Sequence, residues 1–227
     1  MAPLFKEYGC IAMPAGTTGC QMGGWFRKEI NSVDDLKGLK MRIGGWAGKI
    51  LAKLGGVPQQ IAGGDIYPAL EKGTIDAAEW VGPYDDEKLG FNKVAPHYYY
   101  PGWWEGGPML LGIVNLDKWN SLPKNYQSVL EQAGQAANSW MMSKYDQLNP
   151  PSMKKLLAGG TKLHSFSPPI MQACLKATKE LYAETSATNP NFKKVLESLN
   201  GFTANGYQWF QVAELGYDSF MARNAQG

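Results

Sequence analysis

The chain has 227 residues, enough for one large domain or two small lobes, and 44% of them are hydrophobic, so a substantial core is expected. Its net charge is +2 without any block of like charge, which makes nucleic acid an unexpected partner. No run of 18 apolar residues is present to cross a membrane. Eight Trp and 27 Gly fit either an aromatic core or a pocket for a sugar or small acid.

The spacing of cysteine and histidine indicates neither a disulfide framework nor a zinc site. Cys10, Cys20 and Cys174 give an odd count without a CxxC pair. A Cys10–Cys20 bridge is one option that no other feature supports, and we expect small buried thiols instead. His97 and His164 lie far apart in the sequence without a zinc-binding spacing.

Short strands and helices alternate over the first part of the chain. Strands are expected at 8–14, 24–28, 39–43, 57–61 and 74–78. Ser32 and Asp35 form the pattern of a capping box at one helical turn. A helix is expected at 47–54, closed by Gly55 and Gly56, and Asp65 is expected to cap the next. Strand, helix and strand at this spacing predict a parallel sheet.

The second part of the chain is mostly helical. An apolar strand at 108–115 is followed by the longest helix, 124–148, which Asn149, Pro150 and Pro151 are expected to stop or kink. Further helices are expected at 168–185, at 191–199 with Gly201 ending it, and at 207–223. So much helix needs a sheet to pack on, and the sequence predicts that part of this sheet is absent from the chain.

Three segments place a charged side chain where an apolar strand gives way to glycine and tryptophan. They are 40–48, 76–83 and 98–108. Such strand ends are where open α/β sheets bind small ligands, since glycine allows close approach and tryptophan excludes water. The glycines at 44–48 do not complete a phosphate-loop or dinucleotide motif, so they indicate a site for an anion rather than a nucleotide.

Arg42 is the most informative of the charged residues. It lies between the apolar residues Met41 and Ile43, where burial is costly without a partner. A bidentate contact with a carboxylate in a dry cleft is worth about 1.5–3 kcal/mol, so we expect a small ligand carboxylate. The alternative is an internal partner, Asp76 or Glu79, on a neighbouring strand.

Glu79 and Glu105 each adjoin tryptophan. Two carboxylates in one cleft repel unless one is protonated or a cation lies between them. With Gln21 and backbone carbonyls they make an all-oxygen set suited to Na⁺ or Ca²⁺. General acid–base catalysis is the rival role, but no nucleophile motif accompanies the pair. The sequence therefore predicts a binding protein and not an enzyme.

Several segments together resemble the substrate-binding proteins of TRAP transporters, the DctP-like family. The resemblance spans essentially the whole chain, and its strongest parts are 36–43, 63–70, 75–80 and 115–123. It implies an α/β fold: a periplasmic-binding-protein-like lobe with a parallel-rich sheet flanked by helices, an incomplete other lobe and a long connecting helix.

The segments 20–26 and 103–105 resemble the subgroup that binds 2-oxo acids with a metal ion. In that family the strand arginine grips the substrate carboxylate, which implies this role for Arg42. The resemblance implies these ligand-binding residues: Arg42, Gln21, Trp80, Glu79, Trp104 and Glu105. Of these, Gln21, Glu79, Trp80 (through its carbonyl) and Glu105 would hold the ion.

The implied function is that of a periplasmic solute-binding subunit of a TRAP transporter. It would capture a small 2-oxo or 2-hydroxy acid, with Na⁺ or Ca²⁺ and no other cofactor, for sodium-driven uptake. Its partners would be the membrane permease subunits and, through the C-terminal helix, a second copy of the chain. The alternatives are a truncated fragment without binding activity, or an enzyme or sensor on the same fold.

Family members are longer than this chain, so the resemblance implies an N-terminally truncated member without its signal peptide and the first lobe's leading βαβ units. The second lobe is expected at 8–104 and 149–200. Residues 105–148 would be a remnant of the first lobe with the long helix, and 201–227 a C-terminal dimerisation arm. With one wall of the cleft largely missing, bound substrate is expected to be weak or absent.

Overall fold

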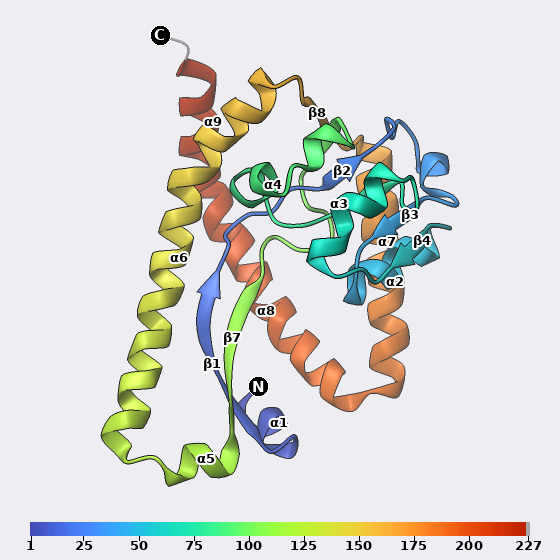
Figure 1. The fold of residues 1–227 in the computed structure, drawn as a ribbon. Coiled ribbons are helices and arrows are strands. Elements are labelled where there is room, and N and C mark those ends of the chain that lie inside the picture. Colours follow the sequence, from blue (N-terminus) through green and yellow to red (C-terminus); the bar gives the residue numbers. More distant parts are fainter. Residues whose placement is uncertain (226–227) are drawn as a thin grey trace. The chain divides into compact units, whose positions relative to one another are not determined.

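The computed structural model describes residues 1–225 (Figure 1). Its contacts divide the chain into two compact units, Met1–Lys179 and a second that begins at Glu180. Each unit is described by itself below. Among the described helices, none is both long and apolar enough to cross a bilayer.

The first unit is built around a six-stranded sheet in the order β4-β3-β5-β2-β6-β8. Its strands are β2 (Gly24–Phe26), β3 (Lys40–Arg42), β4 (Val57–Gln59), β5 (Ala77–Ala78), β6 (His97–Tyr100) and β8 (Lys162–Ser165). Strands β4, β3 and β5 run parallel, as do β6 and β8, whereas β2 is antiparallel to both of its neighbours. The predicted α/β fold with a parallel-rich sheet is confirmed.

The two faces of this sheet carry separate hydrophobic cores, because successive strand side chains point to opposite sides. Phe26 and Tyr99 belong to the core covered by η1 (Val33–Leu36), α2 (Gly45–Lys53) and the first turns of α7 (Pro168–Thr188). Trp25 and Tyr98 belong to the opposite core, with α3 (Gly63–Glu71), η2 (Phe91–Lys93) and the last turns of α6 (Lys124–Ala158). The rings of Trp25 and Tyr98 stack with centroids 3.8 Å apart.

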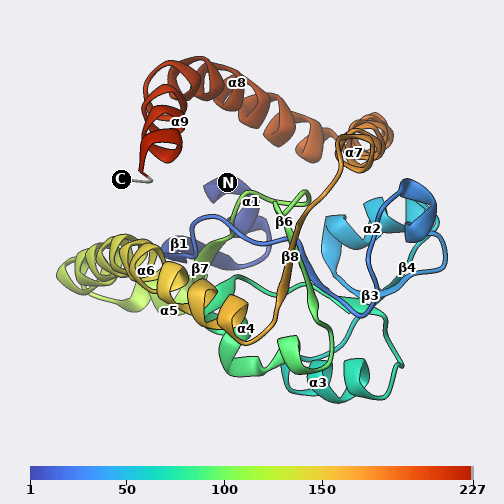
Figure 2. The ribbon, with the colours of Figure 1, turned by 90° about the horizontal axis from the view of Figure 1, so that it is seen from above.

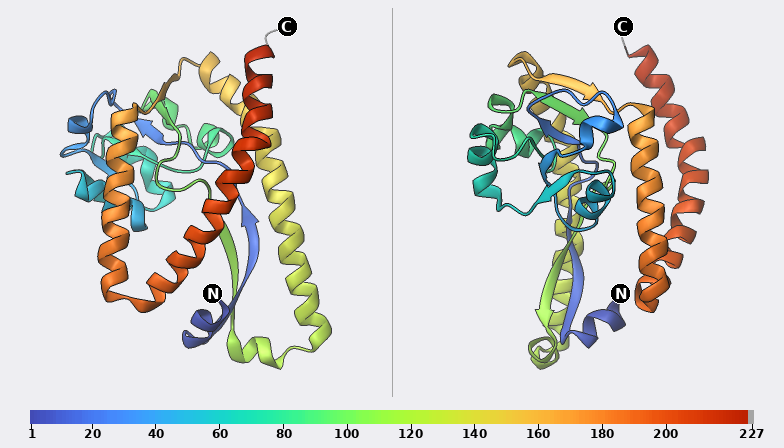
Figure 3. Two further views of the ribbon diagram at one scale, coloured as in Figure 1. Left: turned by 180° about the vertical axis from the view of Figure 1, so that it is seen from behind. Right: turned by 90° about the vertical axis from the view of Figure 1, so that its right-hand side faces the viewer.

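Strand β1 (Cys10–Thr17) lies outside the six-stranded sheet. It follows α1 (Ala2–Glu7) and pairs antiparallel with β7 (Met109–Asn115), which α5 (Leu116–Ser121) follows (Figures 1 and 3). Helix α6 packs along β1, and a Cβ on Gly134 would overlap the carbonyl oxygen of Pro14. Close packing of the helix on the ribbon therefore requires glycine there. The division into two lobes stays a prediction.

The predicted end of the longest helix at Asn149 is wrong, because α6 continues through Pro150 and Pro151 to Ala158. The prolines cannot donate backbone hydrogen bonds, but tertiary contacts on both sides of them offset this loss. Tyr145 before the pair and Leu156 after it are buried. The Asn149 side chain also accepts a 3.1 Å hydrogen bond from the backbone N–H of Tyr84, in α4 (Pro83–Leu89).

Two further predictions of helix boundaries are wrong. Gly201 lies inside α8 (Pro190–Val212). The helix is interrupted at Ala213, and α9 (Glu214–Asn224) follows. A single glycine costs a helix about 1 kcal/mol, which the turns on either side can absorb. Helix α3 begins after Ala62, so Asp65 lies in its first turn rather than at its cap.

The capping box and the cysteines can be compared directly with prediction. Asp35 accepts a 2.8 Å hydrogen bond from the Ser32 backbone, which confirms the capping box. The cysteines are free in the described part of the chain. Cys174 is buried and its pKa is raised to about 12 by burial, whereas Cys20 is exposed and Cys10 intermediate, so full burial was predicted correctly for Cys174 alone.

Candidate functional site

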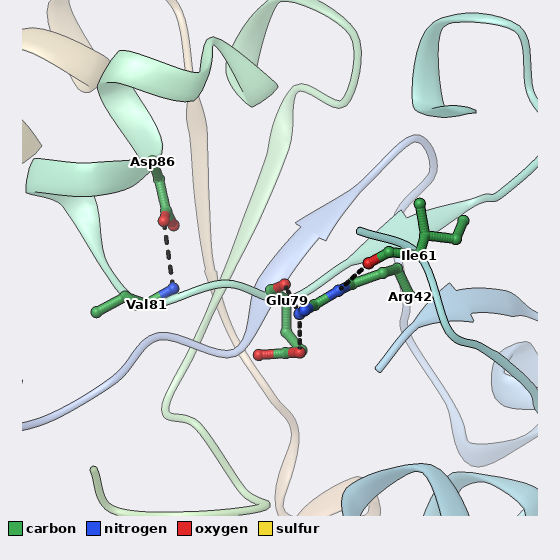
Figure 4. A network of polar contacts seen from close by, with 5 residues as sticks. All are labelled: Arg42, Ile61, Glu79, Val81 and Asp86. Carbon is green, nitrogen blue, oxygen red and sulfur yellow. Dashed lines mark hydrogen bonds and ion pairs between the residues drawn. The ribbon is translucent and has the colours of Figure 1, made fainter. Parts of the chain in front are cut away.

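Arg42 lies at the carboxyl end of β3, between β4 and β5. Its Nε donates to the Ile61 carbonyl oxygen at 3.4 Å, and its Nη1 donates to the Glu79 carbonyl oxygen at 2.9 Å (Figure 4). Nη1 also forms an ion pair with the Glu79 carboxylate. The guanidinium carbon lies 5.1 Å from the centre of the Trp80 ring, in a cation–π contact.

The strand register explains why Arg42 and Glu79 meet. In the parallel pair β3–β5, Arg42 is opposite Ala78. Glu79, the residue after Ala78, therefore lies within reach of the guanidinium. The internal partner considered as the alternative is therefore present, and it is Glu79. Asp76 instead accepts a 3.0 Å hydrogen bond from the Lys40 backbone N–H. A ligand carboxylate would have to share Arg42 with Glu79, and this role of Arg42 stays a prediction.

The carboxyl group of Glu79 is unusually easy to protonate. Burial raises its pKa to about 7, although Arg42 lowers it, and the nearby charges of Glu105 and Asp86 raise it further. Burial also raises the pKa of Glu105. The two carboxyl groups are close enough to interact electrostatically, as predicted, and a cation between them would relieve their repulsion.

A cavity of about 290 Å³ opens beside the Arg42–Glu79 pair. This volume is at the small end of ligand pockets. Its wall includes the N-terminus of α2, whose backbone N–H groups and dipole favour an anion. It is lined by Arg42, Gly44, Gly45, Trp46, Ala47, Glu79, Trp104 and Glu105. Four of the predicted ligand-binding residues thus gather at one cavity.

Gln21 and Trp80 do not line this cavity, but they adjoin it through the backbone. The Gln21 carbonyl oxygen accepts from the Gly102 N–H at 3.1 Å, and the Met22 N–H donates to the Val81 carbonyl oxygen at 3.0 Å. Gln21 is therefore held between the segment that carries Glu79 and the segment that leads to Glu105.

Two buried polar atoms near the cavity lack hydrogen-bond partners among the described residues. They are Oε1 of Gln21 and Nε1 of Trp104. Leaving a buried acceptor or donor unsatisfied costs about 1–3 kcal/mol, so such atoms call for a partner. The acceptor suits a cation and the donor suits an anion. Together with the Glu79 and Glu105 carboxylates, Gln21 offers the all-oxygen donor set that Ca²⁺ and Na⁺ prefer.

Sequence reasoning missed Asp86, which holds the segment after Glu79 in place. Its buried carboxylate accepts hydrogen bonds from Trp25 Nε1 at 2.9 Å and Tyr98 Oη at 2.7 Å. It also accepts one from the Val81 N–H at 3.3 Å (Figure 4). Burial raises its pKa to about 6. Asp86 thereby ties the residues after Glu79 to the sheet, but in sequence it is only an acidic residue near a helix start. Trp46 was also missed as a lining residue.

Comparison with known proteins places the chain in a family. The family model described as bacterial extracellular solute-binding protein, family 7 (DctP) matches residues 5–189. The monocarboxylate 2-oxoacid-binding periplasmic protein of Nostoc sp. is 52% identical over 217 residues, which are 96% of this chain and 60% of that protein.

Two solved structures of TRAP transporter solute-binding proteins are also similar. The protein from Bordetella bronchiseptica RB50 is 50% identical with a TM-score of 0.96, over 98% of this chain and 66% of that chain. It is described as a mixed-occupancy dimer with copurified calcium and picolinate in one active site and the other site apo. The protein from Colwellia psychrerythraea, with bound calcium and pyruvate, is 44% identical with a TM-score of 0.93, over 96% of this chain and 67% of that chain.

The chain spans 60% of the length of the curated relative from Nostoc. The family match extends over most of the chain, from residue 5 to residue 189. The predicted resemblance to TRAP solute-binding proteins is confirmed, and the chain belongs to the DctP family of bacterial extracellular solute-binding proteins.

Proposed function

We propose that the protein is the periplasmic solute-binding subunit of a TRAP transporter that captures a small 2-oxo or 2-hydroxy acid together with Ca²⁺ or Na⁺. The observation that carries this proposal is the cavity in which a guanidinium, two carboxyl groups and the helix α2 N-terminus meet. The name of the Nostoc relative and the calcium and pyruvate of the Colwellia structure support it. The family is one of solute-binding proteins, which agrees with binding and not catalysis.

In this proposal the ion and the acid use different parts of the site. The ion is held by Glu79, Glu105, Gln21 and the Trp80 carbonyl. Its positive charge offsets the repulsion between the two carboxylates. With Glu79 engaged by the ion, the Arg42 guanidinium is released to face the substrate carboxylate. A 2-oxo acid suits such a site because its carboxylate and keto oxygens can both reach one cation, while Trp104 Nε1 donates to the anion.

The transport role implies partners beyond the ligand. The bound acid would be delivered to membrane permease subunits that couple its uptake to sodium, and the relative from Nostoc is named as periplasmic. A cleft that closes around an ion and a small acid presents the loaded state to such a partner. The closing wall opposite Arg42 is not identified among the described residues.

A homodimer through the C-terminal helices is the second part of the proposal. Helices α8 and α9 bury none of their side chains in the single chain. Their large exposed apolar residues include Phe202, Tyr207, Trp209, Val212, Tyr217 and Phe220. Such a surface is large for a monomer and typical of an interface. Light scattering should give twice the chain mass, and Trp209→Glu with Phe220→Glu should give the monomer mass.

Calorimetric titration tests the ligand site. Pyruvate should bind a full-length version of the protein in the presence of Ca²⁺ and lose affinity at least about tenfold when EGTA removes the ion. Arg42→Ala should abolish measurable binding, since it removes the charge partner of the carboxylate. Arg27→Ala, which removes an exposed arginine just after β2, is the matched control. Unchanged affinity in Arg42→Ala, or no heat with wild-type protein at millimolar pyruvate, would contradict the proposal.

A further inference from the structure

Glu29, His97 and His164 form a cluster at the end of the sheet opposite the cleft. Strand β2 begins at Gly24, beside Glu79, and ends at Phe26, which pairs with His97. Glu29 lies in the loop that follows β2. The cluster therefore shares no residue with the Arg42 cavity.

The two histidines meet across neighbouring parallel strands, β6 and β8 (Figure 2). His164 is opposite Tyr99, so His97 lies on the same face, two residues back along β6. Their Nδ1 and Nε2 atoms, respectively, are 3.0 Å apart. The sequence predicts no zinc site because the two histidines are far apart in the chain. The pairing of β6 with β8 nevertheless brings them together in space.

Glu29 completes a set of three ligand atoms. Its Oε1 is 3.8 Å from His97 Nδ1, and the three ligand atoms of the cluster lie within 4.8 Å of one another. His97 is 10% exposed and Glu29 is 47% exposed, so the set has a buried side and a side open to solvent. An ion could enter from the open side and keep water ligands there.

Tyr99 holds both parts of the cluster in place. Its ring stacks on His164 with centroids 4.8 Å apart. Its hydroxyl oxygen accepts a 2.7 Å hydrogen bond from the Ile30 N–H, next to Glu29. Tyr99 therefore restrains the His164 ring and the backbone next to Glu29. The two histidines are thus held by the sheet, whereas the Glu29 side chain is exposed in the loop after β2.

Two charged groups lie near His97, the Glu29 carboxylate and the Lys162 side chain. Lys162 is the positive charge that opposes an incoming cation, and the Glu29 carboxylate counters it.

We propose that Glu29, His97 and His164 form a binding site for one divalent transition metal ion, Ni²⁺ or Cu²⁺, separate from the Ca²⁺ or Na⁺ of the cleft. Two imidazoles and a carboxylate suit such ions better than Ca²⁺. With metal–nitrogen bonds of about 2.1 Å, nitrogens 3.0 Å apart subtend an angle of roughly 90° at the metal. That angle fits adjacent positions of a square-planar or octahedral ion rather than a tetrahedral one.

Titration of Ni²⁺ into untagged, EDTA-treated protein tests the site. The Cys20→Ser background removes the exposed thiol as a competing ligand. One Ni²⁺ should bind per chain and raise the Tm, and His164→Gln should weaken binding at least about 100-fold and Glu29→Gln about tenfold. Glu7→Gln, which removes an exposed carboxylate elsewhere, should bind as the background protein does.

Electron paramagnetic resonance with Cu²⁺ identifies the ligands directly. The spectrum should show two coordinating nitrogens in the background protein and one in His164→Gln. Circular dichroism of each metal-free variant checks that it is folded, and binding of Ca²⁺ with pyruvate should not change. Stoichiometric binding that survives His164→Gln and Glu29→Gln, or no binding at all, would overturn the proposal and leave a hydrogen-bonded histidine pair.

Discussion

Arg42 and Glu79 are joined twice, through the carboxylate and through the backbone carbonyl oxygen of Glu79. The carbonyl contact depends only on the strand register, whereas the carboxylate contact can be exchanged for another anion. A ligand can therefore replace the side chain of Glu79 at Arg42 without detaching β5 from β3. This arrangement reconciles an internal partner for Arg42 with a role in binding an acid.

The free energy of unfolding should depend on pH through the titration of Glu79. Its pKa is raised from its ordinary value of 4.5 to about 7 in the folded state, so the folded chain holds a proton that the unfolded chain releases. This stabilisation is fully present below pH 4.5 and is lost as pH rises through 7. The corresponding loss in the free energy of unfolding is about 3 kcal/mol.

Urea denaturation at several pH values checks this expectation. Glu79→Gln should have a flatter profile than wild type between pH 5 and 8, because it cannot titrate. Asp86, whose raised pKa acts in the same direction, remains in both proteins, so the difference between the two profiles reports Glu79 and its interaction with Asp86. Glu71→Gln, which removes an exposed carboxyl group outside the cleft, serves as the control. Parallel profiles for wild type and Glu79→Gln would contradict the assignment.

Binding of Ca²⁺ should strengthen with pH for the same reason. The ion requires the ionised carboxylate, so binding releases the proton that Glu79 holds at low pH. With a pKa of about 7, the affinity should rise about tenfold between pH 6 and 8. Calorimetry in buffers of different ionisation enthalpy measures the affinity and the proton released. An affinity that does not change with pH would exclude Glu79 as a ligand.

The sequence predicts the parallel part of the sheet well, because strand, helix and strand follow one another between Lys40 and Ala78. It does not predict that β2 lies antiparallel between β5 and β6, since strands of two to four residues carry no readable pairing signal. Pro150 and Gly201 are residues that often end helices. Tertiary packing around Pro150 and the helical turns on both sides of Gly201 keep the helices continuous there.

The same limit applies to the site. Arg42 and Glu79 are recognisable because charge at the end of an apolar strand is unusual. Asp86 and the His97–His164 pair are not recognisable, because their roles come from contacts between residues far apart in the chain. Burial and pairing of those residues become visible only once the strands are in register.

The hydrogen bond between Tyr98 and Asp86 should be a measurable part of stability. Tyr98 is fully buried and its hydroxyl donates to the Asp86 carboxylate at 2.7 Å. Tyr98→Phe keeps the stacked ring and should lower the free energy of unfolding by about 1.5–3 kcal/mol. Tyr8→Phe, at an exposed position, should change it by less than about 0.5 kcal/mol. Equal effects in urea denaturation would show that the buried bond contributes nothing.

Gly24 allows β2 to approach β5 closely next to Glu79, so its replacement should affect both the stability of the sheet and the geometry of the cleft. Its φ of +115° is a conformation that side chains rarely adopt, and a Cβ there would lie 2.7 Å from the Ala78 carbonyl oxygen and 3.2 Å from the Glu79 Cα. Gly24→Ala should therefore cost at least about 2 kcal/mol of unfolding free energy. Because the clash is with backbone, relief requires β2 and the end of β5 to move apart, which changes the packing next to Glu79.

Gly106→Ala is the matched control, since a Cβ at Gly106 meets no atom within 4 Å. Its free energy of unfolding should stay within about 0.5 kcal/mol of wild type. Gly24→Ala should also weaken Ca²⁺ binding, whereas Gly106→Ala should not, although Gly106 directly follows Glu105. Equal stability and equal Ca²⁺ affinity in the two variants would mean that the close approach of β2 to β5 does not position Glu79.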